Sequence, residues 1–111
     1  MNPEELQAGE RGAAGLSGPQ ARIVRSIFDA VLPGAQVWIF GSRATGRARP
    51  FSDLDLLLTQ PSGLSWSQRA ALRDGFEASD LPFRVEVVEA DGLAGGFAAR
   101  VNAERIPLPA A

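Results

Sequence analysis

The chain has 111 residues, a length typical of one domain, and its 45% hydrophobic and 22% charged residues with a formal net charge of -2 exclude a disordered or strongly basic protein. Cys, His, Lys and Tyr do not occur and all 11 basic residues are Arg, which excludes disulfides, imidazole metal sites, Ser-His-Asp triads and catalytic lysines within this chain. The remaining carboxylates, hydroxyls, guanidinium groups and backbone amides suit hard cations such as Mg²⁺.

The first 18 residues lack the basic start and the continuous apolar region of a signal peptide. No apolar run in the chain approaches the ~18 to 20 residues that cross a bilayer, so we expect no membrane association. We expect residues 1–18 to be a flexible leader, residues 19–108 to form the folded domain, and the protein to be cytoplasmic. The net negative charge argues against stable nucleic-acid binding.

A first helix is predicted to begin after Ser17, whose side chain can cap it, with Pro19 in its first turn. Its apolar residues recur at helical spacing: Ile23, Val24, Ile27, Phe28, Val31 and Leu32. Pro33 and Gly34 end this helix, and the apolar run at residues 37–40 predicts a short buried strand.

A second strand is predicted at residues 52–58, where apolar and acidic residues alternate before a Pro-Ser-Gly turn. Ser65 and Gln68 have the spacing of a capping box. A second helix is therefore predicted from there to Ser79, with Trp66 in its apolar stripe.

The last third of the chain predicts one more strand and one more helix. The β-branched run at 83–89 indicates a strand, residues 92–102 show a weaker helical pattern, and residues 106–111 are expected to form an extended tail. The order helix, strand, strand, helix, strand, helix indicates an α/β domain with a small mixed sheet flanked by helices.

Asp53 and Asp55 are two residues apart in the second predicted strand, so both side chains point to the same face of the sheet. Neighbouring carboxylates repel each other unless a metal, an arginine or solvent neutralises them. The pair suits a site for divalent cations, and a solvated strand face is the alternative.

Gly41 and Ser42 directly follow the first predicted strand, where a glycine lets backbone amides approach an anion closely. Phosphate is the expected anion, with the hydroxyl of Ser42 and the guanidinium of Arg43 as further donors. An ordinary turn with exposed arginines is the alternative.

Glu86 is the third acidic candidate, because alternation along its strand puts Glu86 on one face and Glu89 on the other. If the Glu89 face lies against a helix, Glu86 points toward Asp53 and Asp55 from a neighbouring strand. A plain surface position is the alternative, and burial statistics favour it for an isolated glutamate.

The segments GSRATG (41–46) and SDLDL (52–56), followed by a helix and the strand that carries Glu86, resemble the nucleotidyltransferase superfamily related to DNA polymerase β. The chain length and the LPFRVEVV stretch (81–88) are similar to the minimal nucleotidyltransferase (MNT) group, which includes the MntA-like antitoxins. The resemblance covers residues 23–108 and implies a nucleotidyltransferase fold over the folded domain.

The resemblance implies two Mg²⁺ ions and three residues that are both catalytic and metal-binding: Asp53, Asp55 and Glu86. It implies ATP as the substrate, with three nucleotide-binding residues: Gly41, Ser42 and Arg43. The family usually has Asp at the third carboxylate position. Glu86 is one methylene longer, which puts its oxygen about 1.5 Å farther out and predicts weakened catalysis.

The resemblance further implies that AMP is transferred from ATP to a hydroxyl of a partner protein. The partner known for the MNT group is an all-helical HEPN toxin, a ribonuclease that MntA-like antitoxins inactivate by adding AMP to a tyrosine. The chain is then expected to be the antitoxin of a two-component module. Two alternatives stay open: an antitoxin that neutralises its partner by binding alone, and transfer of AMP to a small molecule such as an aminoglycoside.

Overall fold

The computed structural model describes residues 15–109. Over this range the helices are α2 (Gly18–Val31), α3 (Trp66–Glu77) and α4 (Gly95–Glu104), and the strands are β1 (Gln36–Phe40), β2 (Leu54–Gln60), β3 (Val85–Glu89) and β4 (Ile106–Pro107). The short 3-10 turns η1 (Gly41–Arg43) and η2 (Ala90–Gly92) follow β1 and β3. The strand order is β3-β2-β1-β4, with β2 and β3 parallel and the other pairs antiparallel. The predicted small mixed sheet is confirmed.

Both long helices begin at their predicted capping boxes. Ser17 Oγ accepts a hydrogen bond from the Gln20 backbone N–H (3.1 Å), and the Gln20 side chain accepts one from the Ser17 N–H (2.9 Å). Ser65 and Gln68 make the same reciprocal pair ahead of α3, at 3.1 and 2.8 Å. These caps satisfy N–H groups that a helix end otherwise leaves without partners.

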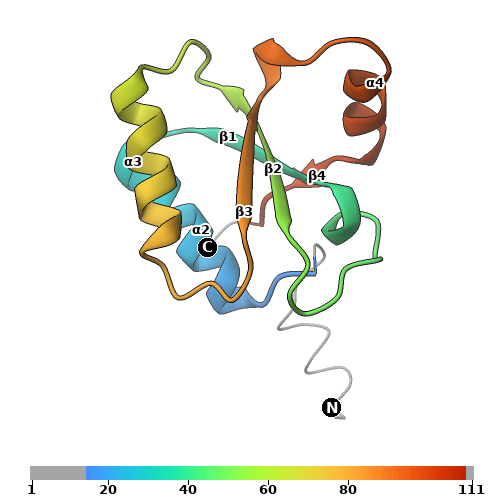
Figure 1. Cartoon of the computed structure of the whole chain (residues 1–111), viewed down its shortest axis with the longest axis horizontal. Coiled ribbons are helices and arrows are strands. Elements are labelled where there is room, and N and C mark those ends of the chain that lie inside the picture. The colour runs from blue at the N-terminus through green and yellow to red at the C-terminus, as the bar shows by residue number, and fades with distance from the viewer. Residues whose placement is uncertain (1–14, 110–111) are drawn as a thin grey trace.

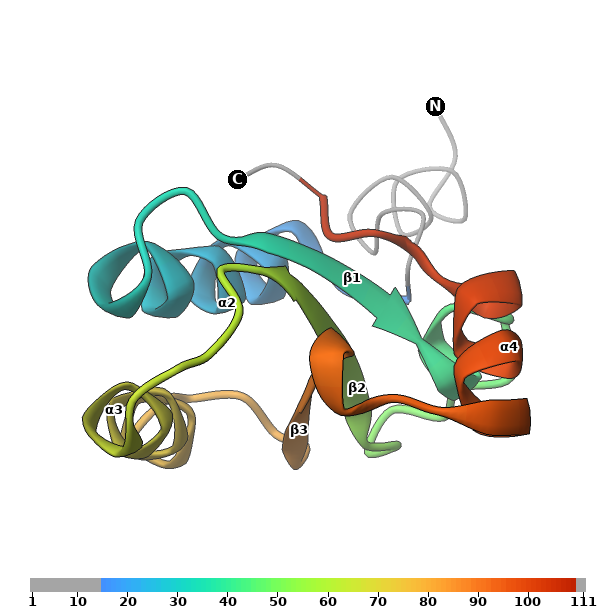
Figure 2. The same cartoon turned by 90° about the horizontal axis from the view of Figure 1, so that it is seen from above.

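Helices cover both faces of the sheet, with α2 and α3 on one face and α4 on the other (Figure 1, Figure 2). The larger core lies under α2 and α3, where the rings of Phe28 and Phe76 meet edge to face with centroids 5.7 Å apart. The smaller core lies under α4 and contains Phe40, Leu57 and Val101. Successive side chains of a strand point to opposite faces, so β2 contributes residues to both cores.

The tail is not simply extended, because residues 106–107 form the edge strand β4 with its Ile106 paired to Ile39 of β1. Pro107 pairs with Trp38 at this edge. A proline is tolerated there because an edge strand does not need every N–H in a ladder, and for this reason the two prolines of the tail conceal the strand in the sequence.

One further expectation is corrected by the structure. Trp66 does not belong to the apolar stripe of α3: its side chain is 84% exposed and lies beside the Arg69 guanidinium, 5.3 Å from the ring centroid. Within the expected leader, residues 1–14 lie outside the described residues, but Leu16 is buried in the larger core. Among residues 15–109, no helix combines the length and apolarity required to cross a membrane.

Candidate functional site

Asp53 and Asp55 lie on the face of the sheet away from α2 and α3. Asp55 is the second residue of β2, and Asp53 lies one residue before the strand rather than inside it as predicted. Leu54 and Leu56, the residues on either side of Asp55, are buried in the larger core, which turns the aspartates to the opposite side. Asp53 is exposed and Asp55 is half-buried.

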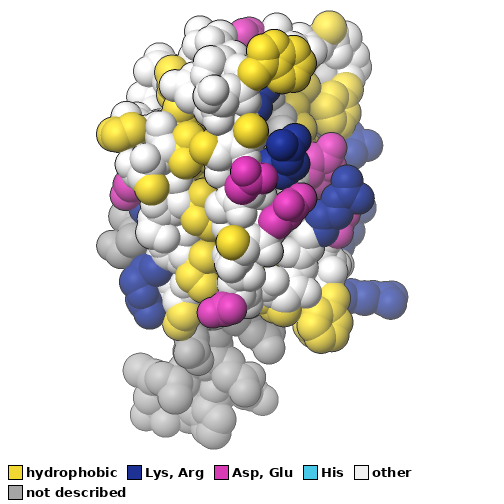
Figure 3. Space-filling view, turned by 60° about the vertical axis from the view of Figure 1, so that its left-hand side comes forward, with side chains coloured by type: hydrophobic (Ala, Val, Ile, Leu, Met, Phe, Trp, Pro, Cys, Tyr) yellow, Lys and Arg dark blue, Asp and Glu magenta, His cyan; other side chains and the backbone are white. Residues whose placement is uncertain are grey.

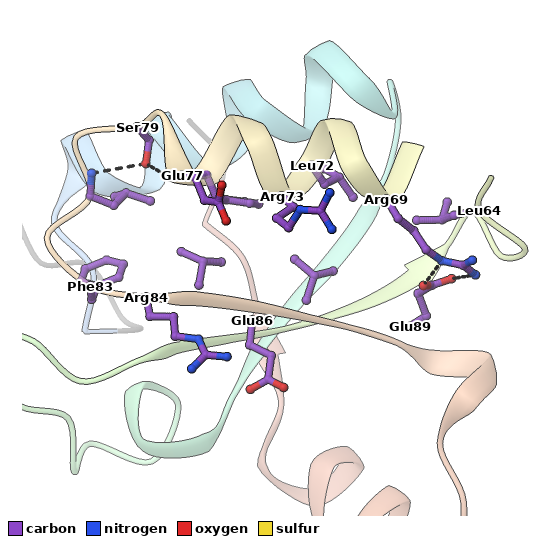
Figure 4. A pocket seen from close by; sticks show the side chains of 14 residues that line it. Leu64, Arg69, Leu72, Arg73, Glu77, Ser79, Phe83, Arg84, Glu86 and Glu89 are labelled. Carbon is purple, nitrogen blue, oxygen red and sulfur yellow. Dashed lines mark hydrogen bonds and ion pairs between the residues drawn. The ribbon is translucent and has the colours of Figure 1, made fainter. Parts of the chain in front are cut away.

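Glu86 is the neighbour of Asp55 in the parallel pairing of β2 with β3. Val85 and Val87, on either side of it in sequence, pack against the larger core, so Glu86 points away from α3 (Figure 4). The structure therefore brings Glu86 beside Asp55 at the start of both strands. The register between β2 and β3, rather than any spacing in the sequence, determines that these two residues are neighbours.

The Gly41 turn lies against the carboxylate of Asp55. Phe40, the last residue of β1, pairs with Asp55, and η1 begins at the next residue. Gly41 has φ +75°, and a Cβ built on it would lie 2.5 Å from Asp55 Oδ2. Glycine is thus required here twice, for its backbone conformation and for the space that Asp55 occupies. Ser42, the next residue, is half-buried.

Negative charge accumulates around Asp55 without a compensating ion pair. Burial raises the pKa of Asp55, and the charges of Glu86 and then Asp53 raise it further. Across residues 15–109, none of the ion pairs includes any of these three carboxylates. In the same range, no group of three or more acidic side chains is gathered closely enough to hold a metal ion as it stands. An oxygen-only donor set with mutual repulsion nevertheless suits Mg²⁺, because a divalent cation would relieve that repulsion.

Arg43 does not offer its side chain to a phosphate, contrary to the sequence-based expectation. Only 4% of the residue is exposed. Its guanidinium donates hydrogen bonds to four backbone carbonyls, those of Gly15, Arg49, Pro50 and Ser52. The donors are therefore used inside the protein, and this structure favours only Gly41 and Ser42 of the three nucleotide-binding candidates.

Arg84 is a residue near the site that the sequence analysis missed. Its carbonyl accepts a hydrogen bond from the Leu54 N–H (2.8 Å), which joins the starts of β2 and β3. Its side chain extends to the same side of β3 as that of Glu86 (Figure 4). The period of two that places Glu86 applies equally to Arg84, so alternation was the available signal.

A groove of about 530 Å³ lies between α3 and β3, and Glu86 is the only predicted site residue in its lining. Acidic and basic side chains lie next to one another on this side of the molecule (Figure 3). Glu89 accepts hydrogen bonds from Arg69 Nε (2.7 Å) and Nη2 (3.0 Å) there. Because the carboxylate of Glu86 points away from α3, the groove and the acidic site are different places (Figure 4).

Comparison with known proteins relates most of the chain to one family. A family model described as the nucleotidyltransferase domain matches residues 21–107. The chain is also similar to the probable protein adenylyltransferase MntA of Haemophilus influenzae, with 40% identity over 67 residues. That alignment includes 60% of this chain and 59% of the relative, so the chain matches about three-fifths of the relative's length.

Two solved structures share the fold. A candidate minimal nucleotidyltransferase is 34% identical, with 97% of each chain covered and a TM-score of 0.63. A toxin-antitoxin structure with AMP-PNP has a TM-score of 0.65 over 82% of this chain and 73% of the other. Its 20% identity supports a common fold alone.

Proposed function

The chain belongs to the nucleotidyltransferase domain family, and we propose that it transfers AMP from ATP to a hydroxyl of a partner protein, as the antitoxin of a toxin-antitoxin pair. The similarity to a probable protein adenylyltransferase supports a protein as acceptor. The resemblance of its motifs to the MNT group further suggests a HEPN-type helical toxin with a tyrosine acceptor. We expect the pair to act in the cytoplasm.

The observation that carries this proposal is the surroundings of Asp55. The glycine turn after β1 lies against its carboxylate, and Glu86 is its neighbour across the parallel pair. A segment suited to phosphate and two acidic strands therefore meet at one residue. Phosphoryl transfer needs this combination, because the protein mainly positions the phosphates and balances their charge.

Mg²⁺ would be held by Asp53, Asp55 and Glu86. When bound, the metal supplies positive charge that stabilises the phosphate oxygens and lowers the pKa of a hydroxyl beside it. The three carboxylates would be its ligands, and Asp55 is the least exposed of these three residues.

Gly41 and Ser42 would receive the triphosphate. The absent Cβ at position 41 lets the turn lie directly against the Asp55 carboxylate, so the triphosphate and that carboxylate would meet at one place. The Ser42 hydroxyl can donate a hydrogen bond to a phosphate oxygen. The acceptor oxygen then forms a bond to the α-phosphorus while the bond to the bridging oxygen of the β-phosphate breaks, and pyrophosphate leaves. We assign the proton of the acceptor hydroxyl to a carboxylate oxygen of Glu86, which is exposed.

The test is transfer of label from α-labelled ATP to the helical partner in the presence of Mg²⁺. We expect label on the partner with the natural chain, and a loss on the order of 10²-fold or more with Asp53→Asn or Asp55→Asn. Asp74→Asn, an exposed aspartate of α3, is the matched control and should transfer normally.

The same assay separates the alternatives. If the two aspartate variants still neutralise the partner without transferring label, the chain is an antitoxin that acts by binding. If label moves to an aminoglycoside or another small molecule with no partner present, the acceptor is not a protein. Either result contradicts the proposed reaction.

A further inference from the structure

We propose that Arg43 is a positioning residue that holds the nucleotide turn, the segment leading to Asp53 and the start of β3 in one arrangement. The inference rests on the proposed function, since it concerns the same site. It assigns to Arg43 a role different from the phosphate contact that the sequence suggested. Arg43 is buried and belongs to η1, the turn that also contains Gly41 and Ser42.

The first connection runs from η1 to the residue before Asp53. Arg43 Nε and Nη2 both donate to the Ser52 carbonyl, at 3.1 and 2.8 Å. Arg43 Nη2 also donates to the Pro50 carbonyl at 3.1 Å. One guanidinium thus fixes the backbone immediately before the first aspartate relative to the turn that would receive the triphosphate.

The segment held in this way has little regular structure of its own. Residues 44–53 consist of turns and irregular backbone, which would otherwise cost conformational entropy to order. A local turn stiffens its end, because the Arg49 N–H donates to Ser52 Oγ (2.8 Å) and the Ser52 N–H to the Arg49 carbonyl (3.0 Å). Arg43 anchors this small turn as a unit, so the position of Asp53 depends on the arginine.

The second connection reaches β3. The centre of the Arg43 guanidinium lies 4.0 Å from the ring centroid of Phe83, which is buried just ahead of the strand that carries Glu86. A stacked guanidinium over an aromatic face is favourable, and a lysine ammonium reproduces neither the planar stack nor the forked donors. Arg43 therefore links three segments of the site. These are the glycine turn to which it belongs, the backbone just before Asp53, and the residue just ahead of the strand that carries Glu86.

Arg43 also joins the site to the segment before α2. Its Nη1 donates to the Gly15 carbonyl at 2.8 Å. Burial lowers the pKa of Arg43 while the nearby charge of Asp53 raises it. A buried cation is costly unless it is hydrogen-bonded, and the four carbonyls supply these bonds.

The test uses Arg43→Lys, with Arg25→Lys as the matched control. Arg25 also donates to two backbone carbonyls, those of Ala35 (3.3 Å) and Leu108 (3.5 Å), but it lies on α2 away from the site. For each variant we would measure kcat for AMP transfer, the Kd for AMP-PNP, the melting temperature, and hydrogen exchange in residues 44–53.

We expect Arg43→Lys to lower kcat by about 10²-fold, because a displacement of ~1 Å among reacting groups has an effect of this size. The Kd for AMP-PNP should change far less, and exchange in residues 44–53 should rise about tenfold while α3 is unchanged. Arg25→Lys should leave kcat and this exchange unaltered. An unchanged kcat in folded Arg43→Lys, or a loss matched by Arg25→Lys at equal stability, overturns the proposal.

A second variant keeps the test decisive if Arg43→Lys does not fold. Phe83→Leu removes the stack but keeps the guanidinium and an apolar side chain, and should lower kcat by about tenfold with faster exchange in residues 44–53. No change in either quantity contradicts the role of Arg43. If the natural chain transfers no AMP at all, the proposed function fails, whereas the exchange measurement still decides whether Arg43 holds the segment.

Discussion

Two glutamates of β3 differ in how their charge is compensated. Glu89 faces α3 and receives two hydrogen bonds from Arg69, and this partner lowers the pKa of Glu89. Glu86 faces the other side, next to the half-buried Asp55, and takes part in none of the ion pairs found in residues 15–109. A carboxylate that is paired with an arginine stabilises the fold, whereas neighbouring carboxylates without such a partner form a candidate cation site.

The sharpest way to break this comparison is to neutralise each glutamate in turn. Glu86→Gln should lower AMP transfer on the order of 10²-fold or more, because it removes a charge needed at the reacting groups. Glu89→Gln should leave kcat nearly unchanged, since its carboxylate is committed to Arg69. Equal losses in both variants would show that the two faces of β3 do not have separate roles.

A second prediction separates the glycine turn at the site from one outside it. Gly41 and Gly34 both have positive φ, +75° and +79°, but only a Cβ at position 41 would meet Asp55. Ala at either position should destabilise the fold by about 1–2 kcal/mol. Only Gly41→Ala should also lower kcat, by about tenfold or more, because it displaces the Asp55 carboxylate. Matched kinetics in the two alanine variants would exclude Gly41 from the site.

A third prediction concerns the length of the third carboxylate. If Glu86 is one methylene too long for the usual arrangement, Glu86→Asp should raise kcat by about tenfold. Glu89→Asp, on the opposite face, should not raise it. A fall in kcat on shortening Glu86 would instead show that this site is adapted to glutamate.

The smallest effect is a difference in how stability depends on pH. The pKa of Asp55 is raised on folding, so its contribution to stability is complete below its unfolded pKa and is lost as pH rises through the folded pKa. Asp55→Asn should therefore stabilise the metal-free fold at pH 7 by about 0.5–1 kcal/mol after screening by solvent, with the difference vanishing in acid.

Glu89 should show the opposite sign, because its pKa is lowered on folding. Its contribution is present above the unfolded pKa and is lost as pH falls through the folded pKa. Glu89→Gln should thus weaken the fold at neutral pH and have little effect in acid. Denaturant unfolding of Asp55→Asn and Glu89→Gln between pH 3 and pH 8 measures both changes in the free energy of unfolding. If the stabilities of the two variants relative to the natural chain change in the same direction with pH, the two faces of the sheet do not differ in their electrostatics.

Local interactions allowed the sequence to predict the helices and the pairing of the aspartates. Capping boxes join residues three apart, so Ser17 with Gln20 and Ser65 with Gln68 identify helix starts without any distant contact. Alternation along a strand likewise separates Asp55 from its leucine neighbours. The family resemblance depends on these same short segments, and the matched family agrees with it.

Tertiary structure alone decided how the separate pieces meet. Three features depend on residues that are distant in sequence. They are the register that puts Glu86 beside Asp55, the pairing of β4 with β1, and the hydrogen bonding of Arg43 to backbone carbonyls rather than to a phosphate. Arginine has the same donors in either setting, so its sequence position could not reveal which acceptors fold around it. Residue types and local spacing thus determined the available chemistry, while long-range hydrogen bonding and packing determined which groups share a site.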